Sequence, residues 1–290
     1  MEPLKITFIG IGLIGGSMAL DMKRLFPNTK RLGIDQNAGH ICEAIELGII
    51  DEETTLDQLA DNDMVVLSIP VGACKKILSS VLDNIGKNTL VFDVGSTKAS
   101  LCQEIANHKH RNHFLAAHPI AGTEFSGPKA AVENLFEHKT NILCESHKTD
   151  SKLLEKAVLL FTKLGMRLSY MDPIEHDRHI AYVSHLSHIS SFMLGKTVIE
   201  KEKDERNIFD MAGSGFESTV RLAKSSPAMW TPIFEENKAN VVESLKEYIA
   251  NLEAFKTWVE NDDFQKVYES MANTNHIKNI LNGITSKNNK

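Results

Sequence analysis

A histidine stands where an apolar run of the sequence ends. Residues 114–117 read Phe-Leu-Ala-Ala, and His118 is followed by Pro-Ile-Ala-Gly-Thr-Glu. If the run is a strand of an open α/β sheet, its C-terminal end faces the cleft in which ligands bind. A neutral imidazole there could take a hydroxyl proton while the carbinol carbon gives up hydride. From spacing alone, a catalytic base and a turn histidine without a role are equally good interpretations.

A glycine-rich loop near the start of the chain could bind a dinucleotide. Its glycines form a G-x-G-x-x-G pattern between the apolar run 5–9 and a helical stretch. In this context the first glycine permits a tight turn, and the second lets backbone N–H groups approach a pyrophosphate. The third glycine lets helix and strand pack closely. The predicted cofactor contacts in this loop are Gly10, Gly12, Leu13, Ile14 and Gly15.

An acidic residue is expected to choose between the two nicotinamide dinucleotides. Asp35 ends the second strand-like run, about 20 residues after the glycines. Its carboxylate would accept hydrogen bonds from the ribose hydroxyls and repel a 2′-phosphate, so NAD is predicted rather than NADP. Ser68 and Pro70 follow the third run and are predicted to contact the cofactor, and Ser96 follows the fourth. All three should line the nicotinamide half of the cleft.

A polar seam runs along one predicted helix in the second half of the chain. It consists of Asp177, Ala181, Ser184, His188, Ser191 and Gly195. These positions lie close to one helix face, which would form either the wall of a polar cleft or a solvent-facing stripe. Histidines also occur at positions 176, 179, 185 and 188. Because these lie on differing faces with no acid–histidine ligand set, no metal site is predicted.

An arginine follows a helix-breaking segment further along the chain. Gly213-Ser214-Gly215 interrupts the helical pattern, and Arg221 lies in the next helical stretch between Val220 and Leu222. Its guanidinium could hold a substrate carboxylate through two parallel hydrogen bonds. On spacing alone, a surface salt bridge is the preferred interpretation.

A scaffold is needed that brings these segments together. Strands are predicted at 6–10, 31–35, 64–69, 90–94, 114–118, 140–144 and 166–171. Helical stretches such as 15–25 and 38–47 separate the early strands. This alternation predicts an α/β fold with a Rossmann-type, doubly wound and mainly parallel sheet.

The pattern becomes helical after Asp172, which with Pro173 suits a helix N-terminus. Helices are predicted at 177–200, 207–224, 229–260 and 263–281. We therefore expect an NAD-binding Rossmann domain at 1–172 and an all-helical domain at 173–290. Between Val241 and Val259, two overlapping apolar stripes share Leu245 and Leu252. Their width fits a helix buried within one chain and a helix shared between subunits equally well.

Composition limits the possible settings of this protein. A length of 290 residues suits two domains, and a net charge of −6 argues against nucleic acid or a membrane surface as a partner. The four cysteines lie far apart without C-x-x-C spacing, so free thiols in a reducing compartment are expected. No apolar run approaches the roughly 20 residues of a membrane span, and no signal peptide is expected. A cytoplasmic location is predicted.

Taken together, these motifs resemble the prephenate/arogenate dehydrogenase family over residues 4–282. The matching segments are G-I-G-L-I-G-G-S at 10–17, D-V-G-S-T-K at 93–98, H-P-I-A-G-T-E at 118–124, S-H-L-S-H at 184–188, and Gly215-Phe216 with Thr219 and Arg221. The H-P-x-A-G-T-E and S-H-L-x-H segments, in this order after a Rossmann loop, are specific to that family.

The resemblance implies a reaction and a set of roles. The reaction is oxidative decarboxylation of prephenate to 4-hydroxyphenylpyruvate, with hydride transfer to NAD, in tyrosine biosynthesis. His118 would be the base at the ring hydroxyl, Ser96 would orient it, and Arg221 would hold a carboxylate. The remaining substrate contacts would be Thr123, Ser184, His185 and His188. The family also implies a homodimer built through the helical domain, which favours the shared-helix interpretation.

Two departures and three alternatives remain open. Glu217-Ser218 stands where many relatives have Arg-Asp, and no fused or regulatory domain fits into the helical part. An arogenate dehydrogenase forming tyrosine would need an acid near the substrate ammonium, for which Glu124, Asp177 and Glu217 are candidates. Prephenate is preferred because the other named cleft residues are neutral or basic.

A β-hydroxyacid dehydrogenase or imine reductase would carry a lysine in the polar seam, which has none. A sensor that binds NAD without turnover would not need His118 and Arg221.

Overall fold

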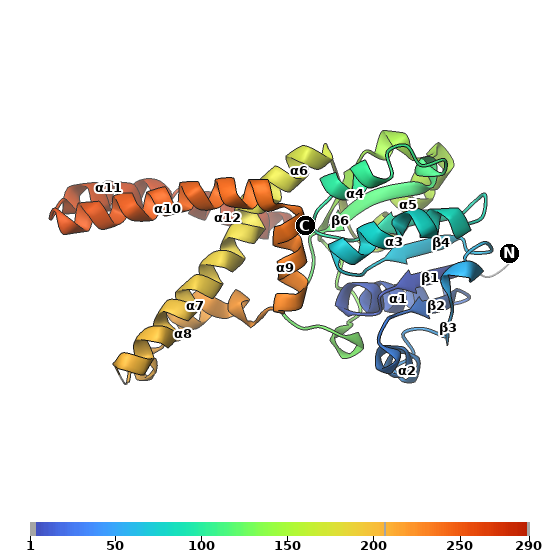
Figure 1. Ribbon diagram of the computed structural model, residues 1–290, viewed down its shortest axis with the longest axis horizontal. Helices are drawn as coiled ribbons and strands as arrows, with labels where there is room; N and C mark the ends of the chain where they lie inside the picture. Colours follow the sequence, from blue (N-terminus) through green and yellow to red (C-terminus); the bar gives the residue numbers. More distant parts are fainter. Residues whose placement is uncertain (1–3, 206, 289–290) are drawn as a thin grey trace. The chain divides into compact units, whose positions relative to one another are not determined.

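Short apolar runs of the chain form one eight-stranded sheet, as a computed structural model describing residues 4–205 and 207–288 shows (Figure 1). The strands are β1 Lys5–Ile9, β2 Lys30–Ile34, β3 Glu52–Glu53, β4 Met64–Leu67, β5 Leu90–Asp93, β6 Phe114–Pro119, β7 Thr140–Cys144 and β8 Arg167–Met171. Their order is β3-β2-β1-β4-β5-β6-β7-β8, and only β6 and β7 pair antiparallel. The mainly parallel, doubly wound sheet is confirmed, and the edge strand β3 adds to the seven predicted strands.

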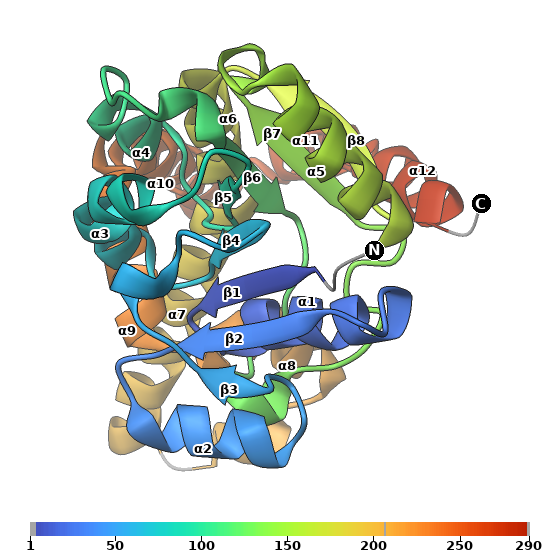
Figure 2. The same cartoon turned by 90° about the vertical axis from the view of Figure 1, so that its right-hand side faces the viewer.

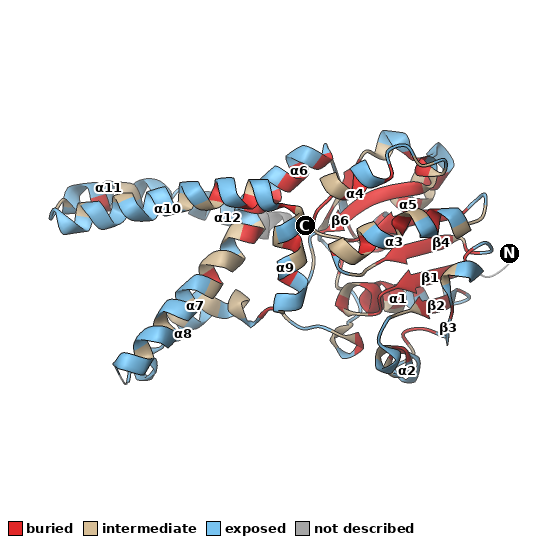
Figure 3. Ribbon diagram, in the orientation of Figure 1, coloured by how far each residue is buried: buried red, intermediate tan, exposed pale blue. Residues whose placement is uncertain are grey.

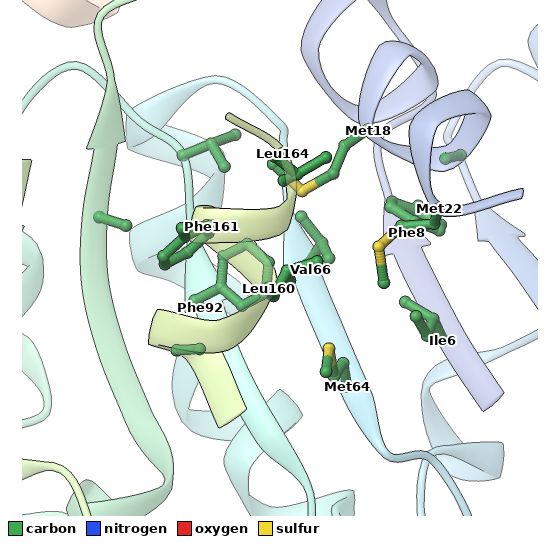
Figure 4. Packing of buried hydrophobic residues seen from close by; sticks show 14 of the residues in the cluster. Ile6, Phe8, Met18, Met22, Met64, Val66, Phe92, Leu160, Phe161 and Leu164 are labelled. Carbon is green, nitrogen blue, oxygen red and sulfur yellow. The ribbon is translucent and has the colours of Figure 1, made fainter. Parts of the chain in front are cut away.

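Helices cover both faces of this sheet (Figure 2). One face carries α1 Leu13–Leu25, α2 Ala38–Glu46 and α5 Ser151–Lys163, and the other carries α3 Val71–Asn84 and α4 Ala99–Glu104. On the first face, Met18 and Phe161 pack among Phe8, Val66 and Phe92, as Figure 4 shows. Burying each such side chain contributes roughly 1.5–3 kcal/mol to folding. The central strands β1, β4, β5 and β6 are therefore the most deeply buried strands of the sheet (Figure 3).

The sheet brings the predicted site segments to one edge. Because β2, β1, β4, β5 and β6 are parallel neighbours, their carboxyl ends lie side by side. The residues at these five ends are Asp35, Gly10, Ser68, Ser96 and His118. The strand order reverses its direction of growth between β1 and β4, which is where such sheets bind nucleotides.

The chain turns helical directly after β8. Helix α6, Pro173–Ile180, begins as predicted, since the Asp172 carboxylate accepts hydrogen bonds from the N–H groups of Ile174 and Glu175. A π-helical segment, Ala181–His185, then precedes α7, Leu186–Asp204. The helical segment expected at 177–200 is therefore confirmed, with a π turn inside it that was not expected. The positions of the polar seam are nevertheless all buried or half-buried, so the seam is not a solvent-facing stripe.

The remaining helices also differ from the expected ones. They are α8 Ser214–Val220, α9 Pro227–Glu236, α10 Lys238–Glu260, α11 Phe264–Thr274 and α12 Ile277–Asn288. Short 3₁₀ turns occur at Leu56–Gln58, Arg111–His113, Pro128–Ala130, Ser146–Lys148, Phe209–Met211 and Arg221–Lys224. The single helix expected at 229–260 is interrupted at Asn237, whose buried side chain donates to the Asp177 carbonyl 2.6 Å away. The expected helix at 207–224 breaks at Gly213, which becomes the N-cap of α8.

The chain divides into two compact units between Asn237 and Lys238. The first contains the sheet and all helices up to α9, and the second contains α10 to α12. The boundary expected between residues 172 and 173 marks the change from strands to helices, and as a domain division it stays a prediction. Of the helices that the structure describes, none has the length and apolarity that crossing a membrane requires.

Candidate active site

The glycine loop is built so that only glycine fits at two of its positions. Gly10 has φ +90°, and a Cβ there would lie 2.5 Å from the carbonyl oxygen of Ser68. A Cβ on Gly15 would lie 2.2 Å from the carbonyl oxygen of Gly10. The hydroxyl of Ser68 donates to that same Gly10 oxygen at 2.6 Å. The strand β1, the glycine loop and helix α1 are therefore closely packed, and Ser68, which follows β4, holds the loop through its hydrogen bond to Gly10.

The start of α1 has room for a ligand. Gly12 is the N-cap and offers no side-chain oxygen to the first N–H groups of the helix. A Cβ at Gly12 would meet nothing closer than the Gly127 nitrogen at 4.0 Å. The fold itself therefore does not demand glycine here, but the approach of a diphosphate to the helix N-terminus would. Leu13 is buried and Ile14 half-buried at the same turn.

Asp35 is held in place at the end of β2. One carboxylate oxygen accepts from the Ile11 N–H at 3.1 Å, and the other accepts from the Asn37 N–H at 2.9 Å. His40 Nδ1 lies 3.3 Å from the second oxygen. Carboxylate oxygens have lone pairs to spare for ribose hydroxyls, so the geometry fits an NAD-type dinucleotide. Pro70, exposed at the N-cap of α3, lies at the next strand end.

His118 is buried and linked to two further buried residues. Its Nδ1 lies 2.8 Å from Nε2 of His176, and Nδ1 of His176 lies 2.8 Å from Oδ1 of Asp177. Burial, followed by the neighbouring His176 and Lys98, lowers the pKa of His118 well below its usual value. The imidazole is therefore neutral at physiological pH and can accept a proton.

Asp177 joins the helical part of the first unit to the loop after β5. Its two oxygens accept from the backbone N–H groups of Lys98 at 2.7 Å and Ala99 at 2.9 Å. The Lys98 ammonium pairs with the buried Asp93 carboxylate and donates to the Ala117 carbonyl at 2.8 Å. These bonds anchor the segment that carries Ser96.

Ser96 does not contact the base as expected. It is half-buried, and within residues 4–205 and 207–288 no hydrogen bond joins it to His118. Nδ1 of His118 bonds to His176 instead, and an orienting role of Ser96 stays a prediction. His176 and Asp177 were not predicted as partners of His118, because an adjacent His-Asp pair on a helix has no recognisable spacing signal. The only hint was a titratable pair just after a helix start, and its partner lies 58 residues earlier.

The π-helical segment places two of the predicted substrate residues. Nδ1 of His188 donates to the Ser184 carbonyl at 2.9 Å, and its ring stacks on Trp230 with centroids 3.6 Å apart. Both Ser184 and His188 are half-buried. Ser184 lies within the π turn and His188 follows it by three residues, and such turns are frequent at functional sites. Trp230 was not predicted as a site residue.

His185 lies deeper than expected for a substrate contact. It is fully buried, packs against Trp230 and Phe234, and accepts from the Asn237 amide at 3.2 Å through Nδ1. Burial lowers its pKa to about 4. In the described part of the chain, neither its Nε2 nor the Trp230 Nε1 has a hydrogen-bond partner. The position favours a supporting role, and substrate contact by His185 stays a prediction.

Arg221 faces the segment that follows His118. Its guanidinium is half exposed, and Nη1 lies 3.3 Å from Oε2 of Glu124. Thr123, exposed beside Glu124, accepts from the Phe125 N–H at 3.3 Å. Glu217 lies 4.0 Å from Lys224 and is mostly exposed. Arg221 thus already pairs with one carboxylate, through a single contact between Nη1 and Oε2.

These positions form one chemical arrangement. A dinucleotide loop, a neutral buried imidazole and an arginine able to bind a carboxylate all belong to the first unit. This combination can take a hydroxyl proton while hydride leaves the same carbon. Within the described residues, no group of histidine, cysteine and acidic side chains could hold a metal ion.

Two family models together match most of the chain. The prephenate dehydrogenase nucleotide-binding domain matches residues 18–170, and the prephenate dehydrogenase dimerization domain matches residues 172–273. The prephenate dehydrogenase of Bacillus subtilis is 30% identical over 92% of this chain and 74% of its own length. The cyclohexadienyl dehydrogenase of Zymomonas mobilis is 28% identical over 89% of each chain.

Solved structures resemble the chain over nearly its whole length. The prephenate dehydrogenase from A. aeolicus, in complex with hydroxyphenyl propionate and NAD+, is 33% identical with a TM-score of 0.88, covering 97% of this chain and 99% of that one. The arogenate dehydrogenase of Synechocystis is 25% identical with a TM-score of 0.74, covering 96% of this chain and 100% of that one.

Proposed function

The chain belongs to the prephenate dehydrogenase family, and we propose that His118 is the base with which it performs the family's reaction. The activity is the NAD-dependent oxidative decarboxylation of prephenate, a step towards tyrosine. The observation that carries the role of His118 is a buried, neutral imidazole at the end of β6, on the same edge of the sheet as the nucleotide loop that follows β1.

The residues of the loop fit the cofactor. When bound, NAD accepts the hydride. Gly10, Gly12 and Gly15 would hold its diphosphate on the N-terminus of α1, with Leu13 and Ile14 in the same turn. Asp35 would accept from the ribose hydroxyls and disfavour NADP. Ser68 and Pro70 would lie along the path to the nicotinamide.

His118 moves one proton out and back. Its Nε2 takes the proton of the ring hydroxyl as C4 loses hydride, so the C4–O bond becomes a carbonyl. The ring carboxylate then leaves as CO2, and the electron pair of the broken C–C bond enters the ring. His118 returns its proton to the phenolate oxygen that results. The base is restored, and aromatisation makes the reaction effectively irreversible.

Arg221 is the proposed carboxylate ligand. Its ion pair with Glu124 is partly exposed and therefore weak enough to be exchanged for a substrate carboxylate. Thr123, Ser184 and His188 would supply neutral polar contacts around the ring, and Ser96 would contact the substrate from the loop after β5. The departure at Glu217-Ser218 leaves Glu124 as the acidic partner of Arg221, because Glu217 faces Lys224.

Prephenate is the proposed substrate over arogenate. Among the acids that could bind an arogenate ammonium, Asp177 already accepts three hydrogen bonds and Glu217 is exposed. Glu124 is the remaining candidate, and its place beside Arg221 makes arogenate the second candidate substrate. The two are separated by competing specificity constants, measured from NADH absorbance. A higher kcat/KM for arogenate would reject the choice, and its loss in Glu124→Gln would identify the acid. Absence of NADH with both substrates would reject the function.

We further propose a reducing, cytoplasmic setting for the enzyme. All four cysteines are free, and Cys74, Cys102 and Cys144 are buried against the sheet. Burial raises the pKa of each of these three thiols. They are inert packing groups, as expected in a compartment that keeps thiols reduced.

A further inference from the structure

We propose that His176 and Asp177 are positioning residues that fix which nitrogen of His118 carries the proton. The proposal rests on the role of His118 as the base in the function proposed above. Two 2.8 Å hydrogen bonds connect the three side chains, from His118 Nδ1 to His176 Nε2 and from His176 Nδ1 to Asp177 Oδ1. All three side chains are buried, His118 in β6 and the other two in α6.

The Asp177 carboxylate determines which atom donates in each of these two hydrogen bonds. Both oxygens of Asp177 accept from backbone N–H groups, so the carboxylate is also the acceptor in its bond with His176. His176 must therefore carry its proton on Nδ1, which leaves a lone pair on Nε2. That lone pair accepts from Nδ1–H of His118. The remaining nitrogen of His118, Nε2, is left bare.

The bare nitrogen is the one that the reaction uses. Within residues 4–205 and 207–288, no side chain or backbone group forms a hydrogen bond with Nε2 of His118. It can therefore accept the hydroxyl proton of the substrate. With the opposite tautomer, Nε2 would carry a proton and could not act as a base. A wrong tautomer in a comparable histidine–carboxylate pair costs about 10⁴-fold in kcat.

The same pair of hydrogen bonds stabilises His118 after it has taken the proton. The imidazolium is formed in a buried site, where burial disfavours the charged form. Its Nδ1–H then donates a charge-assisted hydrogen bond to His176, and the carboxylate of Asp177 lies behind that ring. The positive charge of Lys98 disfavours the imidazolium, but the Asp93 carboxylate, which is paired with Lys98, offsets much of that charge.

A purely structural role for His176 makes a different prediction. The residue could serve only to fill space between α6 and the end of β6. The tautomer of His118 would then be unconstrained, and a ring of similar volume without nitrogen would replace His176 without a specific loss of kcat.

The tautomer can be read directly by ¹⁵N NMR. The full-length enzyme, labelled with [¹⁵N]histidine and saturated with NAD, is measured near neutral pH without substrate. Spectra of His118→Gln and His176→Gln assign the two rings among the 12 histidines. We expect both rings to carry the proton on Nδ1. A proton on Nε2 of His118 overturns the proposal, whatever the activities of the variants.

Two substitutions of His176 separate acceptance of a hydrogen bond from packing. In His176→Gln the amide oxygen can still accept from Nδ1–H of His118, whereas in His176→Phe it has no acceptor. We expect kcat of His176→Phe to fall about 10²-fold, with KM for prephenate changed by less than about threefold. His176→Gln should regain at least about tenfold.

Each result of these measurements decides the matter. An unchanged kcat in folded His176→Phe, or equal losses in both folded variants, overturns the proposal. If His176→Phe does not fold, the tautomer in the unsubstituted enzyme still decides. The expected tautomer in a chain that does not oxidise prephenate would refute the proposed function alone. Turnover by an enzyme with the proton on Nε2 would refute the positioning role alone.

Discussion

At the scale of single residues, burial determines how His118 responds to pH. The pKa of its imidazole lies well below the ordinary value of 6.5, mainly because burial disfavours the charged ring. The base form is the neutral one, so lowering the pH removes activity only when it reaches this depressed pKa. We expect kcat/KM for prephenate to stay level as the pH falls through 6.5. It should decline only when the pH reaches the lowered pKa of His118. An acid limb at or above 6.5 would contradict the buried, neutral base.

Replacing the base should affect chemistry more than binding. In His118→Asn the ring nitrogen that accepts the proton is lost, and kcat is expected to fall by about 10²- to 10⁴-fold with little change in KM. Steady-state kinetics with prephenate and NAD measure this. His113→Asn is a suitable control, because His113 is a half-buried histidine whose Nδ1 lies 2.9 Å from the Thr89 carbonyl. Near-normal kcat in His118→Asn would remove His118 from the mechanism.

Arg221 should act mainly on substrate affinity. Its side chain is about half exposed, with 52% of its surface accessible, so the lost charge-assisted contact is screened by water. We expect Arg221→Gln to raise KM for prephenate about tenfold, with a smaller effect on kcat. Lys224→Gln, which breaks a more exposed ion pair with Glu217, should leave KM unchanged. Equal KM values in the two variants would return Arg221 to the role of a surface salt bridge.

Single residues were predictable from sequence where a motif fixes their surroundings. The glycines, Asp35 and His118 each follow a strand, so their location at the sheet edge was implied by the pattern of strands and helices. His176 and Asp177 could not be found in this way. Their partners, His118 and the N–H of Lys98, lie 58 and 79 residues earlier, and only the packing of α6 brings them together.

At the scale of elements, the first strand, loop and helix behave as one closely packed piece. We expect Gly15→Ala to weaken NAD binding and to lower the melting temperature, because its Cβ would lie 2.2 Å from the Gly10 carbonyl oxygen. Gly72→Ala in α3 is the matched control. A Cβ there meets only Pro232 at 3.9 Å, and removing a glycine from a helix should stabilise it by roughly 0.5–1 kcal/mol. Normal NAD affinity in Gly15→Ala, measured by calorimetry, would contradict the packing argument.

Periodicity predicted which segments are helical but not where the helices break. The π turn at Ala181–His185 leaves the apolar pattern almost intact, so nothing in the sequence indicates it. The interruption at Asn237 depends on a side chain that bonds the Asp177 carbonyl and His185, two groups more than 50 residues away. Such breaks arise from tertiary contacts that a pattern of local spacing does not contain.

At the scale of the whole molecule, α10 carries apolar side chains that are exposed among the residues the structure describes. Among the stripe residues, Ile249, Leu252, Phe255 and Val259 are exposed. The shared-helix interpretation is favoured by this exposure, and residues 172–273 match the family's dimerization domain. A stripe of this kind usually marks an interface.

We therefore expect a homodimer. Light scattering at micromolar concentration should give twice the chain mass of 32.3 kDa. Leu252→Lys should shift the equilibrium towards the monomer by placing a charge in the apolar stripe. Lys256→Gln, which changes an exposed residue paired with Glu260, should not. A mass of one chain for the unsubstituted protein would refute the dimer.

The bonds made by Asp177 also restrict how the first unit can move. Its carboxylate holds the first N–H groups of α4 from a position on α6, and separating the two helices would leave a buried charge without donors. We therefore expect any movement that admits substrate to occur on the side of the site where the half-exposed Arg221 contacts Glu124. The base His118 is bonded to α6, which these bonds hold against α4. We therefore expect its position to be the same before and after substrate binds.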